Sequence, residues 1–187
     1  LISADANQGF DTAQAIEFVR AVTGSGLDFF EQPVASGDLD GMAAVAAASG
    51  IAIGSDEGIH GFDDIRRHHE RKAARGVSLK AIKLGGIRAV AQAGELCGEL
   101  GMSVNISCKT GESSIACAAA LHVASVIPNI DWGLTLTNAS LGEDVTAHPV
   151  RSEKGHAEVL ARPGLGIDVD EDRVRRHRIG AVKRHVA

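Results

Sequence analysis

Three carboxylates at nearly even intervals are the feature that most constrains this sequence. Asp5, Glu31 and Asp56 each end a short apolar run, and Lys80 follows in a similar setting. From 5 to 31, from 31 to 56 and from 56 to 80 the steps are 26, 25 and 24 residues. One strand, one helix and two loops occupy about this length. Polar residues at the carboxyl ends of such strands are typical of an active face built on parallel strands.

The hydrophobic pattern predicts about six strand–helix units. Predicted strands cover 1–6, 27–33, 51–57, 77–86, 102–108 and 129–137, and predicted helices cover 9–26, 38–50, 60–76, 87–101 and 112–128. Asp11 or Thr12 is expected to cap the first helix and Gly24 to end it. Strands that alternate with helices predict an α/β fold with a parallel sheet.

Six units are too few to close an eight-stranded barrel. The chain also begins inside a predicted strand, with leucine as its first residue. We therefore expect the C-terminal part of a TIM-type (β/α) barrel, incomplete without about two upstream units. Residues 1–140 are expected to form the partial barrel that carries a metal site, and 141–187 a return or cap segment of the same domain with a solvated basic tail. A complete open α/β sheet is the alternative.

Composition limits the classes of partner. The chain has 187 residues, of which 44% are hydrophobic, enough for the core of one domain. The net charge of −5 argues against nucleic acid and anionic membranes as partners. No apolar run is long enough to cross a bilayer, and the first residues do not resemble a signal peptide. Three cysteines without a CxxC motif predict free thiols in the cytoplasm.

The three carboxylates suit a hard divalent cation. Mg²⁺ prefers oxygen ligands and keeps positions open for substrate oxygens, and Mn²⁺ is the alternative cation. Without a cation, Asp5, Glu31 and Asp56 would repel one another at close range. Each carboxylate taken alone could instead cap a helix or begin a loop. Their common register predicts a shared metal site.

Lys80 is the predicted acid–base residue. If SLKAIKLGG is a strand, Lys80 and Ile82 share one face and Lys83 lies on the other. Partial desolvation and nearby cations would lower the pKa of Lys80 toward the working range of a general base. Lys83 is a secondary candidate for the site. The alternative is a core lysine that pairs with a carboxylate for structure alone.

Four ordered motifs carry a family resemblance: DANQG, FFEQPV, GSDEG and LKAIKLGGI. Together with KTGESSIACAAALHVA and ARPGLGIDVDEDRV, they resemble the enolase superfamily, specifically the muconate-lactonizing-enzyme subgroup of the mandelate racemase/muconate lactonizing enzyme family. The resemblance covers nearly the whole chain. It implies a Mg²⁺-dependent enzyme that abstracts the proton α to a carboxylate through an enediolate.

The resemblance also implies roles for individual residues. It makes Asp5, Glu31 and Asp56 the metal ligands and Lys80 the residue that moves the proton. Asn7 would lie near the metal and Glu112 near the substrate. From their places at the ends of the last two strands, Lys109 and Thr135 are further candidates for substrate contact.

Two features of the subgroup are missing from this sequence. The second catalytic lysine, in a Lys-x-Lys motif, and the capping domain are both expected upstream of Leu1. The chain alone is therefore expected to bind metal weakly and to be inactive.

The region DWGLTLTN also lacks the Asp-x-Asp of dipeptide epimerases and the glutamate of cycloisomerases. We therefore expect a racemase, epimerase or dehydratase of a small carboxylate, with a hydroxyproline or proline-betaine substrate suggested by LTNASLGEDV. Cycloisomerase and dipeptide epimerase are the alternatives. A non-catalytic barrel fragment or a binding and assembly module is the alternative of another class. The resemblance further implies a homo-oligomer.

Overall fold

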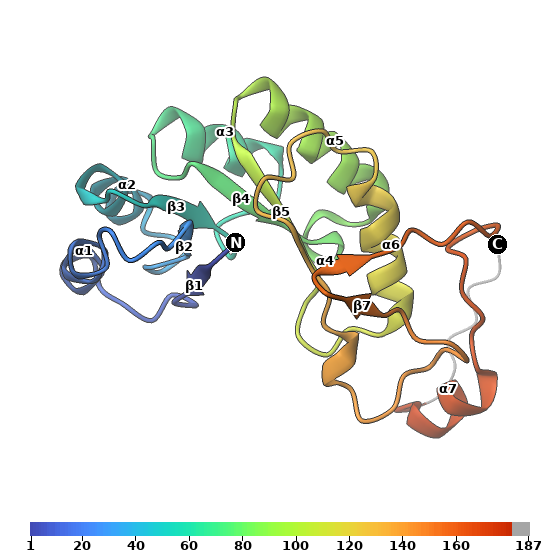
Figure 1. The fold of residues 1–187 in the computed structure, drawn as a ribbon. Coiled ribbons are helices and arrows are strands. Elements are labelled where there is room, and N and C mark those ends of the chain that lie inside the picture. Colours follow the sequence, from blue (N-terminus) through green and yellow to red (C-terminus); the bar gives the residue numbers. More distant parts are fainter. Residues whose placement is uncertain (181–187) are drawn as a thin grey trace.

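A computed structural model describes residues 1–180 and shows a curved sheet of six parallel strands (Figure 1). The strands are β1 (Ser3–Asp5), β2 (Phe29–Glu31), β3 (Ala52–Ser55), β4 (Gly76–Leu79), β5 (Ser103–Ser107) and β6 (Leu134–Thr135). Each strand pairs with the next one along the chain, so the strand order never reverses. Right-handed crossovers in one direction place every connecting helix on the same side of the sheet. This arrangement confirms the predicted partial barrel and excludes the open, doubly wound sheet.

The helices cover the outer, convex side of the sheet in Figure 1. They are α1 (Thr12–Ala21), α2 (Leu39–Ala48), α3 (Phe62–Glu70), α4 (Ala81–Leu84), α5 (Ile87–Glu99) and α6 (Ser114–Ala124). Asp11 caps α1 as predicted, in a capping box with Gln14. The helix ends at Ala21, before Gly24, because the last predicted turn already belongs to the connection to β2.

The predicted strand over 77–86 is wrong in its second half. Strand β4 stops at Leu79, and the four-residue helix α4 follows Lys80. Gly85 and Gly86 have φ angles of 89° and 136°, which end α4 and begin α5. Period-two alternation therefore does not apply beyond Lys80, and Ile82 is 61% exposed.

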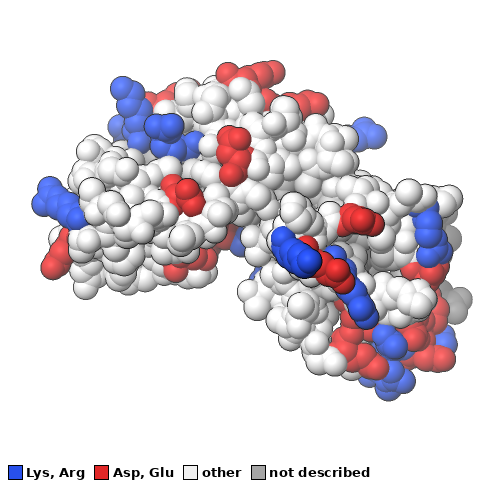
Figure 2. Space-filling model, in the orientation of Figure 1, with Lys and Arg blue, Asp and Glu red and all other residues white. Residues whose placement is uncertain are grey.

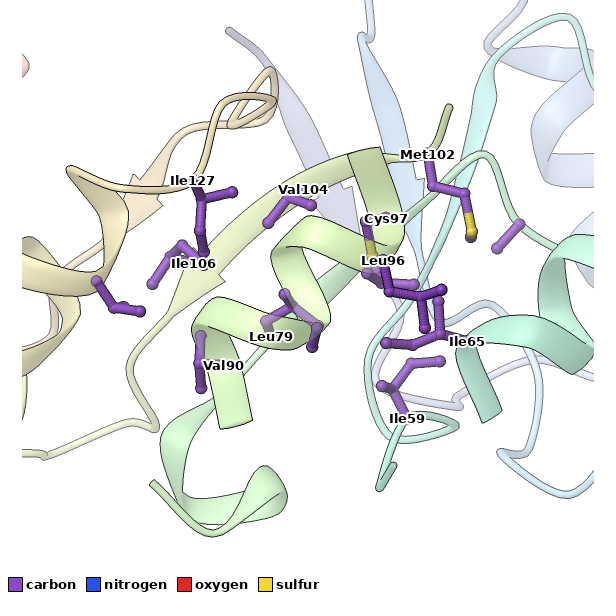
Figure 3. Packing of buried hydrophobic residues seen from close by; sticks show 14 residues of the cluster. Ile59, Ile65, Leu79, Val90, Leu96, Cys97, Met102, Val104, Ile106 and Ile127 are labelled. Atoms are coloured by element: carbon purple, nitrogen blue, oxygen red, sulfur yellow. The ribbon is translucent and has the colours of Figure 1, made fainter. Parts of the chain in front are cut away.

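Residues that point outward from the sheet form the core with the helices. Ile53, Val77, Leu79, Val104 and Ile106 alternate with inward-pointing residues and are almost completely buried. Figure 3 shows Leu79, Val104 and Ile106 packed against residues of α5. Parallel strands covered by helices in this way read as nearly continuous apolar runs, which is why the sequence pattern located them.

Inside the curve, the amino-terminal ends of the strands are filled by Trp132. Its ring stacks on Phe29 with ring centres 4.2 Å apart and planes 7° from parallel. A Cβ atom at Gly76 would lie 2.6 Å from this ring, and one at Gly54 would lie 3.0 Å from it. Trp132 is thus a packing residue, and two strands need glycine to make room for it.

The segment after β6 begins with the short helix η1 (Asn138–Ser140), contains the hairpin β7 (Ser152–Glu153) and β8 (His156–Ala157), and ends with α7 (Glu171–His177). The buried carboxylate of Asp144 holds it to α6. One Asp144 oxygen accepts from the Ser114 amide at 2.9 Å and hydroxyl at 2.6 Å, and the other accepts from the Thr146 amide at 3.1 Å and hydroxyl at 3.0 Å.

The predicted basic tail is exposed over residues 175–178, as expected, but its first residues are helical. Arg173, Arg176 and His177 belong to α7 and make ion-pair contacts with Glu143. Figure 2 shows charges of both signs at the end of the molecule that α7 forms. The rest of that tail, 181–187, lies outside the described residues.

Two further expectations concern the thiols and the membrane. Cys97, Cys108 and Cys117 are free and buried, as the sequence predicted. Within residues 1–180, no helix is long and apolar enough to cross a membrane.

Candidate active site

The three predicted carboxylates come from neighbouring strand ends. Asp5 and Glu31 are the last residues of β1 and β2 and lie opposite each other in the parallel register. Glu31 is also opposite Gly54 of β3, and Asp56 follows two residues later. Because side chains alternate along a strand, Asp5, Glu31 and Asp56 all point to the inner face. The register of the sheet thus brings together carboxylates that are far apart in the sequence.

Glu31 occupies the centre of this group. Burial is the main reason that its pKa is raised to about 7, and the negative charges of Asp5 and Asp56 raise it further. A hydrogen bond from Ser78 and the charge of Lys80 act in the opposite direction. Glu31 therefore lies within electrostatic range of both other carboxylates and of the lysine, as the sequence analysis required.

Asp56 joins the carboxylates to two lysines. It is only 3% exposed, and its carboxylate forms ion pairs with Lys80 through one oxygen and with Lys83 through the other. Lys83 also donates to the backbone oxygens of Asp56 and, at 3.3 Å, of Ser78. The strand model had placed Lys83 on the opposite face. The turn of α4 brings it beside Lys80, since residues three apart share one side of a helix.

The charged groups of this chain alone do not lower the pKa of Lys80, and the lowering expected beside a metal ion stays a prediction. Burial favours its neutral form, but the hydrogen bond and charge of Asp56, with the charges of Glu31 and Glu57, outweigh burial and raise the pKa of Lys80. For Lys83, burial outweighs the attraction of Asp56, so its pKa is lowered. Of the neighbouring charges, the predicted lowering of the pKa considers cations only. It leaves out the carboxylates of Asp56, Glu31 and Glu57 that face Lys80.

Asn7 is placed at the site through Asp5. Its backbone N–H donates to one oxygen of Asp5 at 2.8 Å, and its side-chain Nδ2 donates to the other at 2.8 Å. Asn7 has a φ of 44°, a left-handed conformation that asparagine tolerates better than most residues. This turn orients the carboxylate of Asp5.

Glu112 and Thr135, two of the predicted substrate contacts, make side-chain hydrogen bonds within the chain, whereas the hydrogen bonds of Lys109, the third, are made by its backbone. Glu112 accepts from the Lys109 amide at 3.0 Å, and the Lys109 carbonyl accepts from the Thr137 hydroxyl at 2.7 Å. Glu112 also lies beside the thiols of Cys108 and Cys117. The Thr135 hydroxyl is 3.4 Å from the side-chain amide of Asn105. These contacts leave the proposed substrate role of the three residues a prediction.

The donor set fits a hard cation in its chemistry. It offers carboxylate oxygens from three adjacent strand ends. The pKa of Glu31 is raised mainly by burial and further by the negative charges of Asp5 and Asp56, which a cation would offset. A buried oxygen of Glu57, next to Asp56, has no hydrogen-bond partner. Within residues 1–180, however, no group of three or more His, Cys, Asp and Glu side chains is already arranged to hold a metal ion. Asp56 is engaged by two ammonium groups instead, so metal binding would require Lys80 or Lys83 to move.

A family model described as enolase C-terminal domain-like matches residues 1–173. The chain belongs to this family. A chloromuconate cycloisomerase from Cupriavidus pinatubonensis is 32% identical over 173 residues, which are 92% of this chain and 46% of that protein. An N-succinyl-L-Arg/Lys racemase from Bacillus cereus is 29% identical and covers 91% of this chain and 46% of that protein.

The enolase-like fold is equally clear in solved structures. The muconate lactonizing enzyme from Pseudomonas fluorescens complexed with muconolactone superimposes with a TM-score of 0.89 at 30% identity, over 95% of this chain and 48% of that one. This enolase-like chain therefore spans about half the length of the relatives that it matches. The family membership predicted from the four motifs is confirmed.

Two residues of the site, Lys83 and Glu57, are only weakly indicated by the sequence. Lys83 was only a secondary candidate, although the glycine pair at 85–86 could have signalled a short helix after Lys80. Glu57 was not singled out, although it lies directly beside Asp56. Its effect on the pKa values of both lysines shows that it belongs to the same charged group.

Proposed function

We propose that the protein containing this chain abstracts the proton α to a carboxylate of a small substrate, with Mg²⁺ or Mn²⁺ held by Asp5, Glu31 and Asp56. The observation that carries the proposal is the convergence of these carboxylates and Lys80 on the inner face of the enolase-like half-barrel. The proton α to a carboxylate is a very weak acid, so its removal needs positive charge already in place. When bound, the cation supplies that charge to the substrate carboxylate.

Lys80 holds and moves the proton in this proposal. Its ammonium group pairs with Asp56 when the site is as described, and cation binding to Asp56 would release it. The released ammonium first gives a proton to solvent; the neutral amine then takes the α proton, and the ammonium so formed returns it. Delivery of a proton to the opposite face by a second acid–base group gives racemisation or epimerisation, and loss of a hydroxyl group as water from the neighbouring carbon gives dehydration. A second acid–base group would come from a part of the protein outside this chain.

Cycloisomerisation is the second candidate. It is favoured by the names of relatives, which include chloromuconate and muconate cycloisomerases at 32% and 28% identity. In the direction from muconate to muconolactone, a substrate carboxylate adds to the double bond and a proton is then gained α to the other carboxylate. The same carboxylates of Asp5, Glu31 and Asp56 and the same Lys80 would serve both candidates, which differ in the substrate. The absence of a glutamate in DWGLTLTN keeps α-proton exchange as our first choice.

The test is exchange of the α proton with deuterium from solvent, followed by NMR on the full-length protein. The substrate panel holds N-succinyl-arginine, N-succinyl-lysine, hydroxyproline, proline betaine and small hydroxy acids, each with Mg²⁺ and with a chelator. We expect exchange with Mg²⁺ on at least one substrate and none with the chelator. Conversion of muconate to muconolactone without any exchange on the panel would select the cycloisomerase.

Cation binding without turnover on any substrate would support the remaining alternative, a binding or assembly module that keeps the fold. For the same full-length protein we propose a small-molecule carboxylate as its partner, a homo-oligomeric state and a cytoplasmic location, which three free thiols support. We also propose that 141–187 is a return segment of the barrel domain and that this chain alone is inactive.

A further inference from the structure

A buried glutamine lies directly behind the charged centre, on the outer side of the sheet. Gln32 follows Glu31 and is completely buried between the ends of β2 and β3 and helix α2. Its Oε1 accepts from the amide of Asp56 at 2.9 Å and from the amide of Gly58 at 3.1 Å. The side-chain carbonyl of one strand end thus holds the loop that carries the third carboxylate.

The orientation of the Gln32 amide is fixed by its partners. Backbone N–H groups can only donate, so the atom facing Asp56 and Gly58 must be the oxygen. Nε2 donates to the carbonyl of Val34 at 3.0 Å, which can only accept. Gln32 has a φ of 34°, a left-handed conformation that is uncommon for a glutamine. Such a conformation persists where the surroundings stabilise it, and here three hydrogen bonds do so.

Ser55 at the end of β3 and His68 of α3 close this arrangement. His68 Nδ1 lies 2.8 Å from the carbonyl of Asp64 and must carry the hydrogen, because a carbonyl only accepts. Burial lowers the pKa of His68 and keeps the ring neutral. Its Nε2 is then an acceptor for the Ser55 hydroxyl at 3.1 Å. The Ser55 hydroxyl also lies 3.2 Å from Gln32 Oε1, but its single proton is used by His68, so Gln32 Oε1 serves the two backbone amides.

We infer that Gln32 is a positioning residue for the active centre: its side-chain amide clamps the Asp56–Gly58 turn and thereby fixes the carboxylate of Asp56 between Lys80 and the cation. The part of this inference that involves the cation rests on the proposed function. The contact between Gln32 and the Asp56–Gly58 turn rests on the hydrogen bonds alone. Gln32 faces away from the inner side of the barrel and does not touch the carboxylate or either lysine. It acts through the backbone of Asp56, as outer groups orient the ligands of metal centres.

The clamp is tested by amide hydrogen exchange on the full-length protein. Gln32→Met keeps the side-chain length and removes the acceptor, which leaves two amides without a partner. We expect exchange at Asp56 and Gly58 to become at least about tenfold faster, because lost hydrogen bonds expose these amides locally. Val77 and Leu79 of β4 should stay as protected as before. Unchanged protection at Asp56 and Gly58 would overturn the inference.

The effect on the centre is tested with Mn²⁺ as the probe, titrated by electron paramagnetic resonance without substrate. We expect Gln32→Met to weaken Mn²⁺ binding by about 10- to 100-fold. Val19→Ala creates a cavity in the core beside α1 and controls for general loss of stability, and Gln92→Met is the matched exposed change on α5. Both controls should bind Mn²⁺ within about twofold of the wild type. Equal weakening in Val19→Ala and Gln32→Met would overturn the positioning role.

Gln32→Glu keeps the test decisive if the methionine variant does not fold. A carboxylate at position 32 can still accept from the amides of Asp56 and Gly58. Hydrogen exchange at these two amides should therefore be accelerated less than in Gln32→Met, or not at all. Exchange as fast as in a fully exposed loop would overturn the inference. If the wild type itself binds no Mn²⁺, the proposed metal site fails. The exchange at Asp56 and Gly58 then still decides the clamp by itself.

Discussion

The two ends of the same strands serve opposite purposes in this half-barrel. At the carboxyl ends, Asp5, Glu31 and Asp56 crowd like charges together, and two lysines partly offset them. At the amino-terminal ends, Trp132 fills the interior against Phe29 with no charge at all. The first arrangement costs stability and, in the function proposed above, provides the chemistry, whereas the second provides stability alone. Barrel enzymes in general separate the two faces in this way.

The largest expected effect comes from a substitution at the carboxyl ends of the strands. Lys80→Ala should lower α-proton exchange by about 10²- to 10⁴-fold, because the group that moves the proton is gone. Deuterium exchange measured by NMR on the full-length protein checks this. Lys154→Ala, an exposed lysine in the β7–β8 turn, is the matched control and should keep the wild-type rate. Exchange that persists at the wild-type rate in Lys80→Ala would remove Lys80 from the mechanism.

The next largest effect is expected from a substitution at the amino-terminal ends of the strands, where Trp132 packs. Trp132→Ala should lower the free energy of unfolding by about 3–5 kcal/mol, since it leaves a cavity against Phe29, Gly54 and Gly76. Urea denaturation of the full-length protein measures it. Trp132→Phe keeps an aromatic ring on Phe29 and should lose clearly less. Equal losses in the two variants would show that stacking does not stabilise this end.

A smaller loss is expected from added volume at the same place. A Cβ atom at Gly76 would lie 2.5 Å from the carbonyl oxygen of Ser103 and 2.6 Å from the Trp132 ring. Gly76→Ala should therefore cost about 1–3 kcal/mol of unfolding free energy through overpacking. The control is Gly61→Ala, where a Cβ meets nothing within 4 Å. A thermal or urea midpoint of Gly76→Ala equal to that of the control would contradict the described packing.

The smallest expected effect concerns Asp144, a buried carboxylate that stabilises the fold, unlike the carboxylates at the strand ends. Burial opposes ionisation of Asp144, but its bonds from Ser114 and Thr146 outweigh burial and lower its pKa below the ordinary 3.8. A carboxyl with a depressed pKa in the folded state stabilises fully above its unfolded pKa and loses that contribution as pH falls through the folded value.

Asp144→Asn should therefore cost about 1 kcal/mol at pH 7, and the difference from the wild type should shrink below pH 4. Urea denaturation at pH 7 and at pH 3 checks the prediction. A difference that is constant over this range would mean that ionisation of Asp144 does not contribute.

The sequence predicted the features that depend on periodicity and spacing. Short apolar runs located all six strands, and parallel register made Asp5, Glu31 and Asp56 neighbours. It did not predict the conformation of the residues just beyond the strand ends. Strand β4 ends at Leu79 because a four-residue helix begins there, and the hydrophobic pattern of so short a helix resembles a strand.

Loop side chains were equally hard to predict. Glu112 turns back to its own loop and Asn7 turns to Asp5, because local hydrogen bonds and not sheet register set their directions. The pKa of Lys80 is hard to predict from sequence for a related reason, since the number of carboxylates facing it depends on tertiary structure.

The register of β1 and β2 has a consequence for where this chain can tolerate insertions and deletions. Because Asp5 is opposite Glu31, a shift of β2 by one residue would turn Phe30 inward and hide the glutamate among the helices. The helical connections between strands can lengthen or shorten, since the pairing of neighbouring strands does not depend on the length of the connection. A single residue gained or lost within a strand would abolish the centre while leaving the composition almost unchanged.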